Sequence, residues 1–262
     1  MRKLMVLAAV VLLAPAAWAK VWVTVYRCDE TTPLAVIDPN HTAVYRDIMV
    51  GTRLVFVVSS DTGEPWEGAL LLSWDDAEYG TLSGRGYTPI KPGTSIRTPN
   101  YLGSCLESAG TQAYAVDFTD STGVGLQFWT GKTPYITGGH AATPGDWFIF
   151  DYRAEEIGTV DIGLYNPVVS YVVPIATLSL THVPSRDFNG DTVVDNRDFA
   201  LLASHWHTAA DVDPNGPDAV FDLNADGRVE VGDLMLFSGY WLERTDCGGS
   251  AVDPNNPSAV NP

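Results

Sequence analysis

The sequence has few basic residues, few cysteines and no long apolar run beyond the segment 1–19. Lys and Arg number 15 against 32 Asp and Glu, and the formal net charge is −17. Since contacts to phosphate need Lys and Arg, nucleic acid and anionic membrane surfaces are poor partners for this chain. A membrane-spanning helix needs about 20 consecutive apolar residues, so we expect no transmembrane segment in the mature protein.

Several catalytic motifs are also missing. The sequence contains no Gly-x-Ser-x-Gly nucleophile motif and no phosphate-binding glycine motif before a helix. Its three cysteines are too few for a disulfide scaffold. Cys28 and Cys105 fall in one domain and are the favoured pair, which would leave Cys247 over, but spacing alone leaves the pairing open.

The segment 1–19 has the features of a signal peptide. Arg2 and Lys3 are followed by the apolar run 4–13 and by the small-x-small sequence 17–19. An apolar run of about ten residues is too short to span a bilayer. We therefore expect an exported, secreted protein that begins at Lys20.

Residues 20–182 read as β-structure throughout. Alternating or short apolar runs, separated by Gly and Pro clusters, predict strands near 21–26, 54–58, 69–74, 113–118, 125–129, 147–152, 159–165 and 171–180. No ten-residue stretch keeps a helical period, so the expected fold is an antiparallel β-sandwich. The stretch 145–151, followed by 158–162, resembles the closing hairpin of cohesin-like sandwiches, and an immunoglobulin-like sandwich is the alternative.

The most informative part of the chain is a twelve-residue loop that occurs twice, 35 residues apart. Acid or amide side chains stand at positions 1, 3, 5, 9 and 12 of both copies, and position 7 offers a backbone carbonyl. Ca²⁺ takes 6–8 oxygen ligands and suits this spacing. The predicted ligands are Asp187, Asn189, Asp191, Val193, Asp195, Asp198, Asp222, Asn224, Asp226, Arg228, Glu230 and Asp233.

At these residues the chain resembles a dockerin type I domain, a small calcium-binding module of bacterial extracellular assemblies. An EF-hand has a helix before each loop and usually Glu at position 12. This chain instead has a Pro-containing connection before its first loop and Asp at both twelfth positions, as dockerins do. The resemblance implies two calcium sites and a cohesin-like protein as the partner.

Two departures from the motif are informative. Position 6 needs a sharp turn and usually Gly, and it is Gly227 in the second loop but Thr192 in the first, where we expect a β-branched residue to be strained at positive φ. We therefore expect the second site to bind calcium more tightly. Dockerins often carry a Ser-Thr pair at positions 10 and 11, whereas these positions are 196–197 (Asn-Arg) and 231–232 (Val-Gly). The two repeats would thus present different surfaces.

The predicted organisation is a mainly β chain with a small α module. It comprises a signal peptide (1–19), a β-sandwich (20–182), a linker (183–186), a dockerin-like module (187–242) and a disordered tail (243–262). A single hydrophobic core is marginal in a module as short as 187–242, so we expect calcium to stabilise it.

The composition and motifs favour a secreted, non-catalytic interaction protein of a polysaccharide-related assembly. The alternative is a protein whose sandwich binds or degrades polysaccharide. Exposed aromatic side chains could stack on sugar rings, and Trp66 is the best candidate for exposure. A glycosidase needs two positioned carboxylates, and the candidates are Asp75, Asp76, Glu78, Asp117, Asp151, Glu155 and Glu156.

Overall fold

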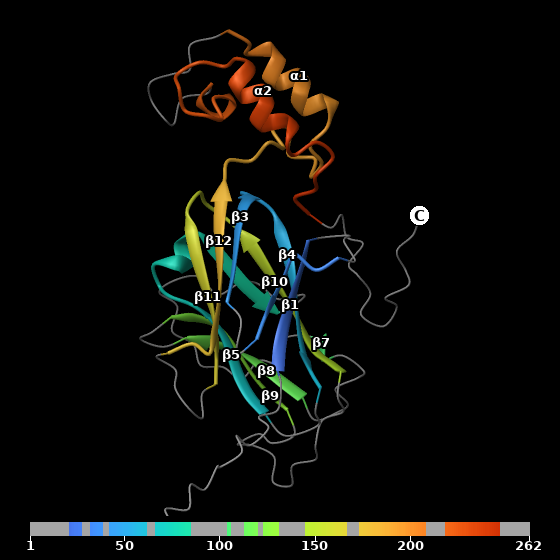
Figure 1. Cartoon of the computed structure of the whole chain (residues 1–262), viewed down its shortest axis with the longest axis vertical. Coiled ribbons are helices and arrows are strands. Elements are labelled where there is room, and N and C mark those ends of the chain that lie inside the picture. The colour runs from blue at the N-terminus through green and yellow to red at the C-terminus, as the bar shows by residue number, and fades with distance from the viewer. Residues whose placement is uncertain are drawn as a thin grey trace, which may run out of the picture.

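The structure is a computed structural model, and it places two antiparallel-rich sheets and a small helical module. It describes residues 21–27, 32–38, 42–61, 66–84, 104–105, 113–119, 123–130, 145–166, 173–207 and 218–246. Figure 1 shows the helices beyond one end of the sheets, next to the end of the strand that leads into them. The arrangement confirms the mainly β fold with a small α module.

The first sheet is antiparallel and has the strand order β2-β1-β4-β10-β6, with β7 paired to β10. Its strands are β1 (Val21–Arg27), β2 (Ala35–Ile37), β4 (Arg53–Ser60), β6 (Gly80–Gly84), β7 (Ser104–Cys105) and β10 (Gly145–Ala154). The longest pairings join β4 to its two neighbours, and Phe56 lies opposite Val25 on one side and Phe150 on the other.

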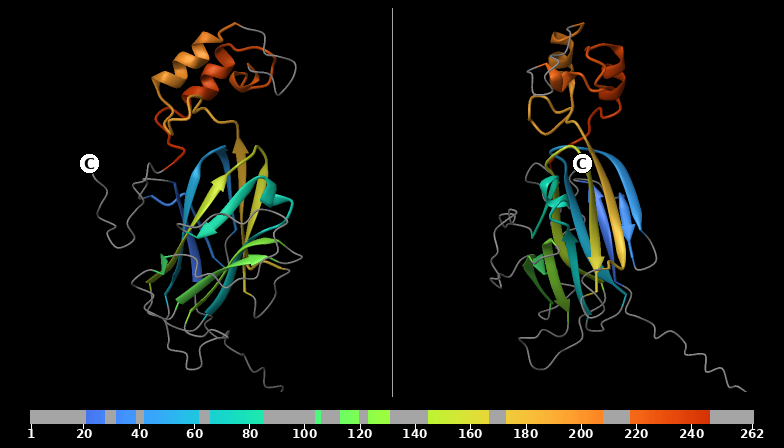
Figure 2. Two further views of the ribbon diagram at one scale, coloured as in Figure 1. Left: turned by 180° about the vertical axis from the view of Figure 1, so that it is seen from behind. Right: turned by 90° about the vertical axis from the view of Figure 1, so that its left-hand side faces the viewer.

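The second sheet has the order β3-β12-β11-β5-β9-β8. Its strands are β3 (Ala43–Met49), β5 (Trp66–Leu72), β8 (Ala113–Thr119), β9 (Val124–Thr130), β11 (Thr159–Tyr165) and β12 (Ala176–Val183). The edge strand β3 runs parallel to β12, while the other pairs are antiparallel. Figure 2 shows the two sheets as facing layers.

The core lies between the sheets and follows the period of two that a half-buried strand requires. In β1, Val21, Val23 and Val25 are at most 1% exposed, whereas the intervening Trp22 is only half-buried. In β12, buried and half-buried residues alternate along the whole strand. Burying one such aliphatic side chain contributes roughly 1.5–3 kcal/mol, so this alternation sets the register of the sheets.

The strand predictions are confirmed in most places and wrong in some details. β2, β3, β6 and β7 were not predicted, and β12 begins at Ala176 rather than 171. The expected hairpin of 145–151 and 158–162 is not a hairpin: β10 pairs in the first sheet and β11 in the second. Residues 155–158 therefore cross from one sheet to the other.

The helical module contains α1 (Asn196–Ser204), the short 3-10 helix η3 (Ala219–Phe221) and α2 (Val231–Ser238). Its core is a separate cluster that includes Leu202 of α1, Phe237 of α2 and the valines at position 8 of each loop, Val194 and Val229. This cluster also includes Met49, the last residue of strand β3. A residue of the sandwich thus belongs to the core of the module.

None of the helices in the described part of the chain is long and apolar enough to cross a membrane.

Candidate calcium-binding loops

The two loops, here called loop one (residues 187–198) and loop two (residues 222–233), have the same hydrogen-bond pattern. In loop one the carboxylate oxygens of Asp187 accept hydrogen bonds from the backbone N–H groups of Asp191 and Thr192, at 3.1 and 2.9 Å. The equivalent bonds to Asp222 in loop two are 3.1 and 2.8 Å long. The first carboxylate therefore closes the turn in both loops.

Positions 3 and 5 continue this pattern. The side-chain oxygen of Asn189 accepts from the N–H of Asp191 at 2.7 Å, and the equivalent bond in loop two is 3.0 Å. The position-5 carboxylate accepts from the N–H of position 7, Val193 or Arg228, at 3.2 and 3.0 Å. The roles of these two residues as carbonyl ligands remain predictions.

The carboxylates at position 12 are completely buried. Asp198 and Asp233 are both 0% exposed, and each is the third residue of its helix. Asp198 accepts hydrogen bonds from the N–H groups of Asn189 and Asp195, at 3.0 and 2.9 Å. Burying a carboxylate costs free energy unless a cation or several donors compensate it, so this position suits a metal ligand.

Position 9 places the helix next to the loop. Asp195 and Glu230 are the N-caps of α1 and α2, and the acids three residues later complete a capping box in both. A capping box satisfies N–H groups that the first helical turn leaves without partners. The last two acidic ligand positions of each loop are therefore held at a helix N-terminus, where negative charge is favourable.

In loop one, carboxylate oxygens of three predicted ligands lie close to one another. One carboxylate oxygen each from Asp187, Asp191 and Asp198 lies within 4.8 Å of the other two. These like charges repel one another in the absence of a cation. All the predicted ligands offer hard oxygen donors, which fits Ca²⁺ better than a metal that prefers sulfur or imidazole.

The tight turns need a left-handed backbone twice in each loop, and one of the two residues in each is not Gly. In loop one, Gly190 and Thr192 have φ of 72° and 76°. In loop two, Ala225 and Gly227 have φ of 56° and 88°. The positive φ of Thr192 was predicted, whereas that of Ala225 was not, because position 4 carries no strong requirement in the motif.

Arg197 makes loop one electrostatically different from loop two. Its guanidinium donates to a carboxylate oxygen of Asp191 at 3.0 Å. The pKa of Asp191 is lowered by the hydrogen bond from the side chain of Asn189 and, further, by Arg197. Position 11 of loop two is Gly232, which offers no such cation. The sequence places Arg197 at position 11 but gives no sign of its contact with a predicted ligand.

Each loop pairs with the segment that follows the other helix. The carbonyl of Val194 accepts from the N–H of Leu242, and that of Val229 accepts from His207, at 2.9 and 2.8 Å. Leu242 and His207 are themselves equivalent, 35 residues apart, and both have positive φ. The repeats therefore interlock by exchanging these segments, which the apolar residues at position 8 alone did not indicate.

Helix α2 exposes two apolar side chains that have no apolar counterpart of similar size on α1. Val231 and Met235 are 59% and 71% exposed, and residues four apart in a helix share a face. The equivalent residues of α1, Asn196 and Ala200, are exposed but offer little apolar surface. Phe199 of α1, which is 41% exposed, also offers apolar surface, so the two helices present different apolar side chains to another protein.

Several of the carboxylates considered as alternative catalytic residues make polar contacts within the sandwich. Asp151 on β10 pairs with Arg53 at 2.6 Å, Asp76 accepts from Ser73 at 2.7 Å, and Glu155 accepts from Thr81 at 3.2 Å. The side chain of Asp117 lies outside the described residues. Three of the candidate acids therefore have structural partners.

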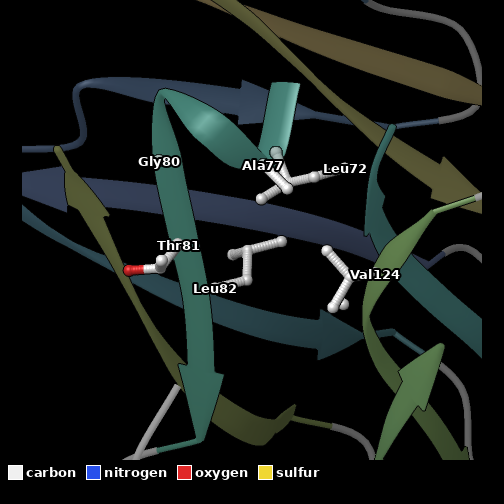
Figure 3. Close-up of a pocket in the computed structure, with 7 residues that line it drawn as sticks. Leu72, Ala77, Gly80, Thr81, Leu82 and Val124 are labelled. Carbon is white, nitrogen blue, oxygen red and sulfur yellow. The ribbon is translucent and has the colours of Figure 1, made fainter. Parts of the chain in front are cut away.

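One pocket in the described part of the sandwich lies between η1 (Asp76–Glu78), β5, β6 and β9. Figure 3 shows Leu72, Leu82 and Val124 around it. Its volume of about 10 Å³ is no more than the space that a single water molecule needs, so it is too small for a substrate.

Other predictions fall outside the described residues. These are the signal peptide, the pairing of Cys28 with Cys105, the exposure of Trp66 and the tail beyond residue 246. They remain predictions.

The comparison with protein families covers the module alone. Residues 185–242 match the dockerin type I domain, in agreement with the predicted 187–242. No curated protein matches the chain. Calcium binding, which dockerin domains share, therefore rests on both the loop geometry and the family match.

Proposed function

We propose that the dockerin type I domain of this chain binds two calcium ions and then docks on a cohesin-like domain of another extracellular protein. In this proposal the chain is exported by its segment 1–19 and has no catalytic role of its own. The observation that carries it is the dockerin match at residues 185–242 together with two loops of matching geometry.

The twelve loop residues predicted from the sequence are the proposed ligands. Their carboxylates are already arranged around each turn, and the two at position 12 are buried without a basic side chain among their hydrogen-bond donors. A bound Ca²⁺ would supply the compensating positive charge at each site. Because unbound carboxylates repel one another, we expect calcium to stabilise the folded module.

The proposed docking face is the exposed apolar side of α2, centred on Val231 and Met235. These side chains would be buried by a cohesin-like partner, and burial of their exposed parts contributes roughly 2–4 kcal/mol before ordering costs. The equivalent positions of α1 carry Asn196 and Ala200, next to the exposed Phe199, so the two repeats would present different surfaces to the partner.

The test is binding of the full chain to a panel of immobilised cohesin domains, in calcium and then in chelator. We expect calcium-dependent binding that the double substitution Val231→Asp and Met235→Asp abolishes. The matched control is Val44→Asp, because Val44 is an equally exposed apolar residue (66%) but lies on the sandwich strand β3. This control should bind like the unchanged protein.

Two outcomes would contradict the proposal. If no cohesin domain is retained in calcium, or if the α2 substitutions leave binding unchanged, docking through this face is wrong. Retention of the full chain on insoluble polysaccharide, independent of calcium, would instead favour the alternative in which the sandwich engages glycan.

A further inference from the structure

A short segment after α2 connects loop one to the sandwich. This segment, residues 243–246, is called the strap below; it was predicted to begin the disordered tail. The structure instead places Thr245 with only 5% exposure. The N–H of Thr245 donates to the carbonyl of Thr192 at 3.1 Å, and its hydroxyl donates to Asp187 at 3.2 Å. On its other side, the carbonyl of Thr245 accepts from the N–H of Arg53 at 2.7 Å.

Two other strap residues add to this connection, and Glu243 contacts both loop one and the sandwich. The carbonyl of Glu243 accepts from the N–H of Val194 in loop one at 2.9 Å, while its side chain forms an ion pair with Arg27 of β1. Asp246 lies 3.6 Å from the guanidinium of Arg53. Both side chains of the Arg27–Glu243 pair are largely shielded, with 15% and 17% exposure, so water screens this pair less than a surface pair.

Apolar contacts extend this junction away from the strap. Met49, at the end of β3, is fully buried in the core of the dockerin domain, and Val183 packs against the same cluster. The guanidinium of Arg186 lies 4.4 Å from the ring centre of Tyr240, and Arg186 is 3% exposed. The connection 183–186, predicted as a linker, is thus packed rather than free. Figures 1 and 2 show the dockerin domain at this end of the sandwich.

We propose that calcium in loop one fixes the dockerin domain to the sandwich through the strap. The two groups of loop one that hold Thr245 are a carboxylate oxygen of Asp187, a proposed calcium ligand, and the carbonyl of Thr192, in the tight turn of the loop. An ion bound in loop one orders both groups, so it orders the site that receives Thr245. Loop two has no described contact with the strap, and its ion leaves the junction unchanged.

This coupling works in both directions, because linkage between two binding events is reciprocal. Contacts between the strap and the sandwich hold loop one in its calcium-binding form, and therefore raise its calcium affinity. When calcium is removed, repulsion among Asp187, Asp191 and Asp198 loosens the loop and releases Thr245. The strap then no longer holds loop one to the sandwich, while Met49 stays in the core of the dockerin domain.

Hydrogen exchange at the amide of Arg53 reports directly on this junction, because that N–H donates to Thr245. The experiment uses the full chain and rests on calcium binding as proposed above. In saturating calcium we expect Asp187→Asn to speed exchange at Arg53 by about tenfold or more, as expected for local opening. The matched substitution Asp222→Asn in loop two should leave it unchanged, and amides in the middle of β4 serve as the internal control.

A second variant separates the coupling from simple unfolding of the domain. Arg27→Met removes the ion pair from the sandwich side, at a residue that is not among the proposed calcium ligands. We expect it to weaken calcium binding at loop one by about fivefold, the lower end of typical coupling, and to leave loop two and the helical circular dichroism unchanged.

The outcomes are distinguishable. If calorimetry detects no calcium binding, the proposed function fails together with this inference. Only the coupling is wrong if calcium binds but the exchange rate at Arg53 changes neither with calcium nor with Asp187→Asn. The same holds if Arg27→Met leaves the calcium affinity of loop one unchanged.

Discussion

Replacing Thr192 with Gly tests whether backbone strain sets the affinity of loop one. Thr192 has a φ of 76°, a region that β-branched residues rarely occupy. Its side chain makes none of the ligand contacts described above, because the loop uses its N–H and carbonyl. The substitution therefore removes strain without removing a ligand.

The expected gain follows from two opposing terms. A non-Gly residue at positive φ costs roughly 1–3 kcal/mol, and a β-branched residue lies toward the upper part of that range. The flexibility that Gly adds to the unbound loop costs back about 0.5–1 kcal/mol. A net gain of about 1–2 kcal/mol corresponds to a 5- to 30-fold tighter first site. Ala225→Gly in loop two relieves a milder strain, so its gain should be smaller.

Isothermal titration of the full chain with calcium measures both effects. The unchanged protein should show two classes of site, the weaker of which is strengthened by Thr192→Gly. Arg197→Gln should also strengthen this site, since it removes a cation from Asp191. The three carboxylate oxygens of loop one that already lie within 4.8 Å of one another favour tighter binding at the first site, and strain has to outweigh this effect. Equal affinities that Thr192→Gly does not change would refute the strain argument.

Three further predictions concern other parts of the chain. Asp233→Asn should weaken the second calcium site by about tenfold or more, because it removes a buried, charged ligand; titration of the variant with calcium measures this loss. Burial holds the pKa of His182 in the folded chain below its ordinary value of 6.5. Between the folded and the unfolded pKa, the unfolded chain binds a proton that the folded chain does not. The free energy of unfolding should therefore fall as the pH drops through about 6.5. Urea unfolding at pH 7 and pH 5 should show a flatter pH dependence in His182→Gln, and an unchanged slope would contradict this. Mass mapping of the unreduced protein should find Cys28 bridged to Cys105, and two free thiols after oxidative folding would rule this out.

The pH prediction depends on a fixed tautomer. The ring Nδ1 of His182 lies 2.8 Å from the backbone carbonyl of Glu156, which can only accept, so Nδ1 carries the proton. The other nitrogen, Nε2, therefore accepts from the hydroxyl of Tyr152 at 3.0 Å. A second proton on the ring would remove that acceptor inside the core.

The calcium loops could be predicted because their chemistry is local. All the predicted ligands of a site, from position 1 to position 12, lie in one loop of twelve consecutive residues. The spacing of the acids therefore specifies the arrangement of the ligands without any information on contacts between distant segments. Even the positive φ of Thr192 followed from the demands of a sharp turn. Ala225 escaped because Ala carries no signal for a left-handed backbone.

The parts that could not be predicted depend on contacts between distant segments. Strand β3 has no clear alternation and is defined by its parallel pairing with β12, including a register shift near Asp47. The sequence does not show that the chain crosses from one sheet to the other between β10 and β11, because either sheet could accept an alternating strand. Thr245 follows a domain boundary and precedes a Gly-rich stretch, so its role is set only by Arg53 and Asp187, both distant from it in the sequence.

The dependence of the dockerin domain on calcium has to be considered together with Met49. A domain of this size has a small core, and one member of that core belongs to β3 of the sandwich. Truncation before loop one would remove Met49 and the partners of the strap, so a fragment would lack apolar contacts as well as ions. Loss of helix in such a fragment would then not identify calcium as the cause. In the intact chain the sandwich supplies part of this stability, so chelation should loosen the calcium loops and the junction before it unfolds α1 and α2.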